Sequence, residues 1–305
     1  MVNKEALTID IADKNFCVFK GSWISLTRPL TLTGTFSTII VGTLFANNVH
    51  HIDMGLFIGL LLASLLIQSS VNMFNDYYDF KNGQDKDKWH TANNAVSFRE
   101  PSFHTVKYIA SLLLLFAMII GLWLVLHSNI WVLFIGIAGM VSGIYYSYGK
   151  RSFSALGFGE IVAAIFLGIV PTNLAYMIQG NDFSLNVFLV SIVFGLLIST
   201  MILTNNIRDL KKDIGFRKTI AIRLGRKTAL RLLAGILFSL YGLTCLLIIF
   251  QVLPWQTILV IMAIPVAKHL YGSIKRNIQI GYMKWIAWHH WLFSMLFVAG
   301  LLFAF

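Results

Sequence analysis

The chain has 305 residues, of which 57% are hydrophobic and only 12% are charged, and its net charge is +11. Soluble domains carry roughly 25% charged residues, so this composition excludes a soluble globular protein. Together with a mean hydropathy of +0.74, it predicts an all-α integral membrane protein in which residues 1–305 form a single membrane-embedded domain.

Uncharged apolar segments recur along the chain, each close to the ~20 residues that a membrane-spanning helix requires. The uncharged stretch between Lys107 and Lys150 is too long for one span, and the polar residues 127–129 divide it into two. Pro254 marks the first turn of a new helix after another long apolar stretch. We therefore predict nine transmembrane helices, at residues 30–47, 54–74, 107–126, 130–148, 160–179, 184–205, 229–250, 253–271 and 285–305.

The basic residues report the orientation of these spans. All 24 Lys and Arg residues fall in the N-terminal segment and in the loops after the second, fourth, sixth and eighth spans. The loops on the other side contain only Asp53 and Asp182 as charged residues. Because cytoplasmic loops collect Lys and Arg, we expect a cell-membrane protein with its N-terminus in the cytoplasm and its C-terminus outside. The positive charge then attracts anionic substrates and membrane lipid, and no nucleic-acid partner is expected.

Two similar acidic motifs follow the second and the sixth predicted spans. "NDYYDFK" at 75–81 and "NNIRDLK" at 205–211 share the pattern N-x-x-x-D-[F/L]-K, and another carboxylate follows each, at Asp85 and Asp213. The repetition predicts two four-helix pseudo-repeats, about 27–150 and 157–275, with a ninth helix added. Both motifs then lie at the cytoplasmic ends of equivalent helices.

The spacing within each motif predicts a metal site. Residues four apart share one face of a helix, so Asn205, Asp209 and Asp213 line up, as do Asn75 and Asp79. Clustered carboxylates at a membrane edge repel one another unless a cation lies between them, although a solvated helix end is the alternative. Ligands that are all oxygen favour Mg²⁺, which also bridges to substrate phosphates. The predicted metal ligands are Asp76, Asp79, Asp85, Asp209 and Asp213.

Basic residues flank both motifs and predict a diphosphate substrate. A metal held by carboxylates can bind the diphosphate, and Lys and Arg can neutralise its remaining charge, which stabilises pyrophosphate as a leaving group. Each basic residue taken alone is better explained as an interfacial anchor than as a ligand, and only the set suits a diphosphate. The set comprises Lys81, Arg208, Lys211, Lys212, Arg217 and Lys218.

The paired motifs, in a nine-span chain with its basic residues inside, resemble the UbiA superfamily of intramembrane prenyltransferases over essentially the whole chain. Residues 27–32 ("TRPLTL"), 158–160 ("FGE") and 205–227 are most similar to the branch that prenylates 1,4-dihydroxy-2-naphthoate for menaquinone. The resemblance implies a UbiA-type bundle, Mg²⁺, a polyprenyl diphosphate donor and an aromatic acid acceptor. The family's two motifs match Asn75, Asp79 and Asp85, with Asp76 beside them, and Asn205, Asp209 and Asp213.

The resemblance also implies roles for "YSYGK" at 146–150, which matches the family's Tyr-x-x-x-Lys. There Lys150 contacts the diphosphate and Tyr146 faces the prenyl cation, which the negative face of an aromatic ring attracts. The alternatives are an interfacial aromatic belt for the tyrosines and a membrane anchor for Lys150.

Two segments bear on the acceptor. The loop 88–101 lacks the Gly-rich Arg-Asn-Gly stretch of the dihydroxynaphthoate branch, and Arg99 is its nearest basic match for the acceptor carboxylate. Gly149-Lys150 replaces that branch's frequent Gly-Pro and is closer to the hydroxybenzoate branch. We expect prenylation of 1,4-dihydroxy-2-naphthoate with loss of CO₂, giving demethylmenaquinone and pyrophosphate, with a 4-hydroxybenzoate-type acceptor or haem as alternatives. The candidate bases are Asp76 and Glu160.

A two-repeat membrane transporter is the alternative from a different class, since such proteins also carry internal repeats and intramembrane charges. Both acidic motifs, however, lie at helix ends on one predicted side of the membrane. Release of pyrophosphate from a prenyl diphosphate distinguishes the two classes.

Overall fold

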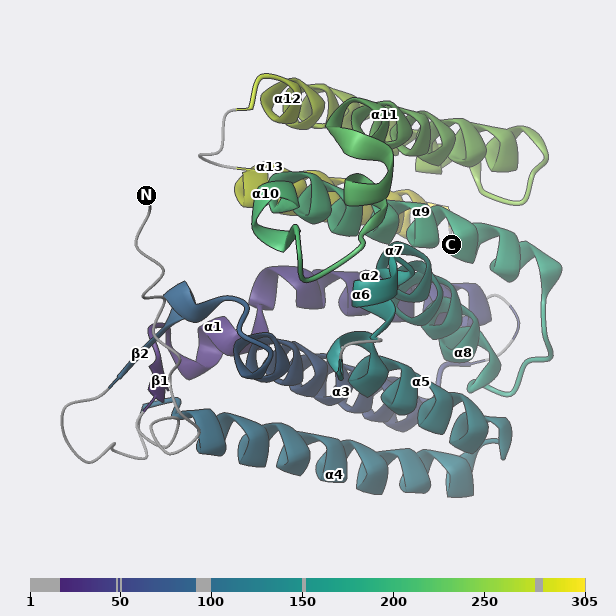
Figure 1. Ribbon diagram of the computed structural model, residues 1–305. Coiled ribbons are helices and arrows are strands. Elements are labelled where there is room, and N and C mark those ends of the chain that lie inside the picture. The colour runs from purple at the N-terminus through teal and green to yellow at the C-terminus, as the bar shows by residue number, and fades with distance from the viewer. Residues whose placement is uncertain are drawn as a thin grey trace.

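The computed structural model describes residues 17–47, 49, 51–91, 100–149, 152–277 and 282–304. Long helices dominate this part of the chain and run approximately parallel to one another (Figure 1). They are α2 (Pro29–Asn47), α3 (Met54–Lys81), α4 (Phe103–His127), α5 (Trp131–Ser147), α7 (Gly159–Ala163) with η3 (Ala164–Ile169) and α8 (Val170–Met177), α9 (Leu185–Arg208), α11 (Ile220–Ile249), η4 (Trp255–Ala263) with α12 (Ile264–Lys275), and α13 (Tyr282–Leu302).

The predicted all-α membrane architecture is confirmed. Within the described residues, eight helical segments are long and apolar enough to cross a membrane, and α5 is a further apolar helix of 17 residues. Each of these segments corresponds to one predicted span. Because α5 is shorter than the other eight, nine is an approximate count of the membrane spans among the described residues.

The two largest differences from the predicted spans lie at the ends of α3 and α11. α3 continues to Lys81 instead of ending near residue 74, and α11 begins at Ile220 rather than near 229. Hydropathy falls where charged residues begin, whereas backbone hydrogen bonding continues through them, so both helices extend into the aqueous boundary. Gly225, with φ of 73°, interrupts α11 near its start; this left-handed conformation favours glycine.

Polar side chains define where several helices begin. The carboxylate of Asp53 accepts hydrogen bonds from the backbone N–H groups of Gly55 and Leu56 at the start of α3. Ser102 and Ser184 cap α4 and α9 in the same way. Such caps satisfy amide donors that have no partner within the helix.

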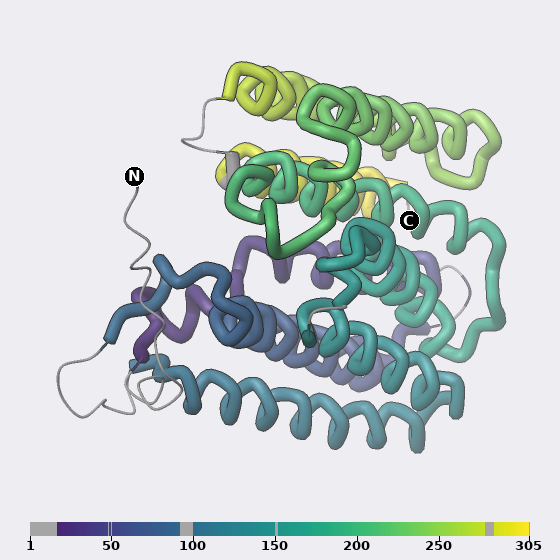
Figure 2. Tube along the Cα trace, in the orientation of Figure 1, coloured from purple at the N-terminus to yellow at the C-terminus, as the bar shows by residue number. Residues whose placement is uncertain are grey.

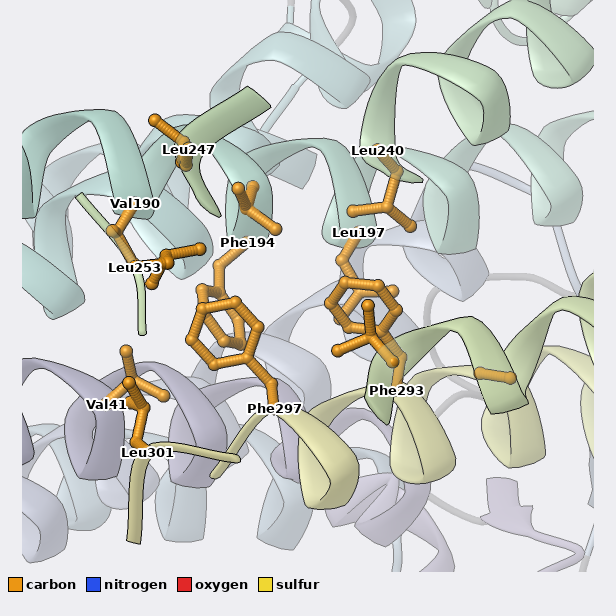
Figure 3. Close-up of a cluster of buried hydrophobic side chains, with 13 residues drawn as sticks. Val41, Val190, Phe194, Leu197, Leu240, Leu247, Leu253, Phe293, Phe297 and Leu301 are labelled. Carbon is orange, nitrogen blue, oxygen red and sulfur yellow. The ribbon is translucent and has the colours of Figure 1, made fainter. Parts of the chain in front are cut away.

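α9 lies at the centre of the bundle. Its apolar segment is 67% buried by protein, compared with 22% for α4, which therefore presents most of its surface to lipid. Figure 3 shows Phe194 and Leu197 of α9 facing Phe293 and Phe297 of α13. The rings of Phe194 and Phe297 meet edge to face, with centroids 5.1 Å apart, a favourable arrangement of aromatic quadrupoles.

Glycines allow α9 to approach the broken helix α7–η3–α8 closely. A Cβ on Gly168 of the π-helical segment η3 would lie 2.6 Å from the Cα of Gly195 on α9. Small residues at a helix contact let backbones pack directly, which is the main source of helix association within a bilayer.

Shorter elements gather at one end of the bundle. α1 (Trp23–Thr27), α10 (Leu210–Asp213) and the antiparallel strands β1 (Cys17–Phe19) and β2 (Trp89–Thr91) lie where α3 and α9 end (Figure 1). The chain after α10 descends toward α6 (Phe153–Leu156), as Figure 2 shows, and Lys218 N donates to Ala155 O at 2.9 Å. Both acidic motifs therefore end in the same polar region.

Candidate active site

The first acidic motif occupies the last two turns of α3, where Asn75, Asp76 and Asp79 are all buried. Asp76 accepts a hydrogen bond from Arg28 Nη2 at 2.8 Å and another from Lys88 Nζ at 2.9 Å. Arg28 caps α1 with φ of 53°, and Lys88 ends η2 (Lys86–Lys88). Asp76 thus ties two polar segments to α3.

Asp79 connects the first motif to the second. Its Oδ1 accepts a hydrogen bond from Arg217 Nη2, and both side chains are largely buried. Burial alone lowers the pKa of the Arg217 guanidinium, but the carboxylates of Asp79 and Asp213 raise that pKa above its ordinary value. Arg217 therefore stays charged beside the motifs.

Asp85 makes a second connection between the motifs. Its carboxylate forms ion pairs at 2.7 Å with both Lys88 and Lys212. Partial burial raises the pKa of Asp85, yet the two ammonium groups outweigh that effect and hold it at about 2. Asp85 has φ of 53°, so the chain turns back after α3 and carries this carboxylate toward the second motif.

The second motif lies at the end of α9. Arg208 is the last helical residue, Asp209 follows it, and backbone hydrogen bonds from Asp209 N to Asn205 O and from Asp213 N to Asp209 O keep the four-residue spacing. Arg208 also forms an ion pair with the partly exposed Asp209. Asn205, Asp209 and Asp213 therefore keep helical spacing, although α9 ends at Arg208 and α10 begins at Leu210.

Asp213 differs from the other acids of the site. It is buried, and within the described part of the chain it forms no ion pair. Burial is the main cause that raises the pKa of Asp213 to about 6; Arg217 acts in the opposite direction, and the nearby carboxylates add to the rise. A cation bound here would relieve an uncompensated buried carboxylate.

The oxygen atoms at this end of the bundle suit a hard divalent cation. The Oδ1 atoms of Asn75 and Asn205 are buried, and neither accepts a hydrogen bond from the described residues. Those residues contain no preformed group of three or more His, Cys, Asp or Glu around one metal position. Mg²⁺ is ordinarily held by one or two carboxylates with water and substrate phosphate rather than by a protein cage, so the residues present fit it.

An intramembrane cavity of about 200 Å³ begins beside the motifs, where Asn75, Asn205, Arg28 and Tyr146 line it. It continues between α2, α3, α5, α7–η3–α8 and α9 to Leu174, and most of its lining is apolar. Pockets that enclose a drug-sized ligand span about 300–1,000 Å³. This cavity can therefore accommodate reacting groups but not the whole of a long lipid substrate.

The remaining predicted residues lie in different places. Lys81, Lys211 and Lys218 are exposed at the motif end of the bundle. Lys150 and Arg99 lie outside the described residues. Of the candidate bases, Asp76 is engaged by two cations.

Glu160, the other candidate base, accepts a hydrogen bond from Asn206 Nδ2 at 2.6 Å and is absent from the cavity lining. It joins α7 to α9.

Sequence reasoning gave no role to Arg28 or Lys88. Arg28 lies in "TRPLTL", a segment similar to the family, and both residues otherwise contribute only to the charge that indicates topology. The available signal was an arginine directly before a membrane span that begins with proline at position 29. Their common partner, Asp76, becomes visible only when α1, α3 and η2 are placed together.

An all-helical membrane bundle whose two acidic helix ends meet over an apolar cavity is the architecture expected of an intramembrane prenyltransferase. The chain belongs to the UbiA prenyltransferase family, whose model matches residues 35–298. The family predicted from the motifs is thus confirmed, and the protein is a multi-pass membrane prenyltransferase. Membership of an enzyme family does not favour the transporter alternative.

Curated relatives cover nearly the whole chain. The 1,4-dihydroxy-2-naphthoate octaprenyltransferase of Bacillus subtilis is 31% identical over 91% of this chain and 91% of its own length. The 2-carboxy-1,4-naphthoquinone phytyltransferase of Synechocystis is 26% identical over 91% and 92%, respectively. Among solved structures, a UbiA homolog from Archaeoglobus fulgidus bound to DMAPP and Mg²⁺ has a TM-score of 0.61, with 14% identity, over 92% of this chain and 98% of that one. This last similarity establishes the fold.

Proposed function

We propose that this protein transfers a polyprenyl group from a polyprenyl diphosphate to 1,4-dihydroxy-2-naphthoate, with release of CO₂ and pyrophosphate. The observation that carries the proposal is the meeting of the two motifs above the cavity, through Arg217 with Asp79 and Lys212 with Asp85. The names of the bacterial relatives support the choice of acceptor. The proposed arrangement keeps the N-terminus and both motifs on the cytoplasmic side, in two pseudo-repeats of about 27–150 and 157–275.

The motif residues would bind the diphosphate. Mg²⁺, held by Asp79, Asp85, Asp209 and Asp213, would act as a Lewis acid on the diphosphate oxygens. Asp76, which already pairs with Arg28 and Lys88, would position those two cations.

The basic partners of these acids would complete the diphosphate site. Arg217 and Lys212 form ion pairs with Asp79 and Asp85, and their N–H groups would also bind the substrate phosphates. Guanidinium and ammonium groups bind phosphate oxygens through charge-assisted hydrogen bonds. Arg208 and the exposed Lys81, Lys211 and Lys218 would add positive charge at the same end of the bundle. A diphosphate contact by Lys150, which lies outside the described residues, is proposed from the family motif alone.

The reacting carbon of the donor would lie in the cavity just below the motifs. The C1–O bond breaks, its electron pair leaves with pyrophosphate, and Tyr146 offers the face of a π-system to the allylic cation. The ring carbon that carries the acceptor carboxylate bonds to C1. The carbon–carboxylate bond then breaks, CO₂ leaves, and that electron pair restores the aromatic ring, giving the prenylated hydroquinone. The rest of the donor chain leaves the cavity toward lipid.

Product analysis tests this proposal. Membranes containing the protein are incubated with a polyprenyl diphosphate, Mg²⁺ and either 1,4-dihydroxy-2-naphthoate or 4-hydroxybenzoate, and the products are identified by mass. We expect a decarboxylated prenyl naphthalenediol that is lost with EDTA and restored by excess Mg²⁺. Prenylation of 4-hydroxybenzoate alone would show that the acceptor is wrong, and activity unaffected by EDTA would show that the metal is wrong.

A further inference from the structure

Two helices that do not line the cavity carry a concentration of positive charge. α11 and α12 lie side by side at one edge of the bundle (Figure 1), and residues 214–305 contain no Asp or Glu. Five exposed basic residues lie on these helices or at the end of α12, and we call them the basic surface: Lys227, Arg231, Lys268, Lys275 and Arg276. The reaction proposed above uses none of them.

The basic surface differs from the other cations at this end of the bundle. Lys88, Lys212 and Arg217 each pair with an aspartate in or just after the first acidic motif. Among the described residues, no carboxylate forms an ion pair with a member of the basic surface. Its charge is therefore available to an anion from outside this part of the chain.

Arg231 and Lys268 lie at nearly the same level of the bundle. Arg226 Nη2 donates to Ile274 O, which ties the beginning of α11 to the last turn of the antiparallel α12. At 1.5 Å per residue, Arg231 lies five residues or about 7.5 Å further along α11. Lys268 lies six residues or about 9 Å back along α12. The two cations are therefore at similar depths on neighbouring helices.

That depth is the edge of the apolar part of both helices. No charged residue occurs between Arg231 and Lys268 in the sequence. Next to Lys268, the ring of His269 contacts that of Trp285 on α13, with centroids 4.0 Å apart. Tryptophan is enriched where lipid headgroups meet the hydrocarbon core. Arg231 and Lys268 thus lie at the level of lipid phosphates.

We propose that the basic surface binds the headgroup of an anionic phospholipid in the leaflet on the motif side of the membrane. Basic side chains between transmembrane helices at this level are suited to such headgroups. The guanidinium of Arg231 and the ammonium of Lys268 bind the phosphodiester through charge-assisted hydrogen bonds. The other three residues of the basic surface attract the negative headgroup from the aqueous side.

A lipid fits this surface better than an acidic segment of a soluble protein. Phe238 follows Arg231 by about two turns of α11 and is 81% exposed, and Met262, which precedes Lys268, is 64% exposed. An acyl chain can cover these apolar side chains while its phosphate remains with the two cations. A soluble acidic segment can reach the charges but cannot follow the apolar surface into the membrane.

Lipid retention tests the proposal without turnover. The full chain, purified in neutral detergent, is mixed with phosphatidylglycerol or with phosphatidylcholine of the same acyl chains, and native mass spectrometry measures the bound lipid. Each basic residue near a membrane surface favours an anionic lipid by about 5-fold. Arg231 and Lys268 together should therefore give wild type a preference for phosphatidylglycerol of about 25-fold.

Single substitutions locate the site. Arg231→Gln and Lys268→Gln should each reduce the preference by about 5-fold, whereas Arg231→Lys should retain most of it because the charge remains. Lys107→Gln is the matched control, since Lys107 is exposed near the beginning of α4 and borders another uncharged stretch. It should leave the preference unchanged. Equal melting temperatures in phosphatidylcholine show that the variants are folded.

Three results would overturn the proposal. Wild type could retain both lipids equally, or the two Gln variants could keep the full preference. Inorganic phosphate could raise the melting temperature as much as phosphatidylglycerol does, which would indicate an anion site without lipid. Finally, poly-aspartate could bind wild type in an Arg231-dependent way while phosphatidylglycerol does not, which would assign the basic surface to an acidic protein segment.

Discussion

Arg217 donates a hydrogen bond to Asp79 across 138 residues of sequence, and this contact joins the loop after the second acidic motif to the end of α3. Neither side chain is free to solvent, since 15% of the arginine side chain and 7% of the aspartate side chain are exposed. The pair balances charge where the two motifs meet.

Replacement of Arg217 should reduce both stability and donor use. Arg217→Ala leaves the buried Asp79 carboxylate without its partner, which we expect to lower the free energy of unfolding by about 3 kcal/mol. Loss of a charged hydrogen bond to the diphosphate should lower kcat/KM for the donor by about 10- to 150-fold. Thermal melting in detergent and steady-state kinetics measure the two effects. Arg217→Lys should retain more of both than Arg217→Ala, and equal losses in the two variants would contradict a charge-based role.

Asp213 and Asp79 should respond differently to neutralisation. Asp213→Asn removes a buried carboxylate that forms no ion pair with the described residues, so its melting temperature should stay unchanged or rise slightly. Asp79→Asn leaves Arg217 unpaired and should melt at a lower temperature. Both should lose about 100- to 1,000-fold in turnover if each stabilises the departing diphosphate. An Asp213→Asn protein that aggregates would show that this carboxylate is structural.

Cysteine labelling tests the orientation in the membrane. In a chain carrying Cys17→Ser and Cys245→Ser, a single cysteine is introduced by Asp182→Cys or by Lys211→Cys, both exposed positions. A membrane-impermeant maleimide added to intact cells should label the first protein and miss the second, because the basic loops remain in the cytoplasm. Permeabilised cells should show labelling of both. Labelling of Lys211→Cys from outside intact cells would reverse the proposed topology.

The contact between η3 and α9 should tolerate no added methyl group. A Cβ on Gly168 would meet backbone atoms of Gly195 at 2.6 Å, so Gly168→Ala must separate the two helices and should cost about 1–3 kcal/mol of stability. It should also raise the donor KM, because η3 contributes Phe166 and Leu167 to the lining of the cavity.

Gly235→Ala on α11 is the control for that substitution, since no atom lies within 4 Å of its added Cβ. It should leave the melting temperature unchanged or slightly raised, because alanine is the better helix former. If both glycine variants melt alike, the helices are not in close contact at Gly168.

The sequence by itself determined the class of protein, the approximate positions of the membrane helices and the two acidic motifs. These properties depend on local composition, because a bilayer requires about 20 apolar residues for each span and cytoplasmic loops collect basic residues. The spacing of Asn205, Asp209 and Asp213 was likewise readable, because residues four apart share a helix face. The ends of α3 and α11 were not readable from hydropathy, since backbone hydrogen bonds continue past the first charged residue.

Only the tertiary structure decided which charges meet and which side chains face the cavity. The sequence contains 24 basic residues, and nothing in its order indicates that Asp76 pairs with Arg28 or that Asp85 pairs with Lys212. The polar part of the cavity lining depends on the same information, because Gln68 and Asn72 acquire their orientation from hydrogen bonds to α2 and to the residue that precedes Arg28. Partners separated by tens of residues are brought together by helix packing, which depends on the shapes of surfaces formed by several segments at once.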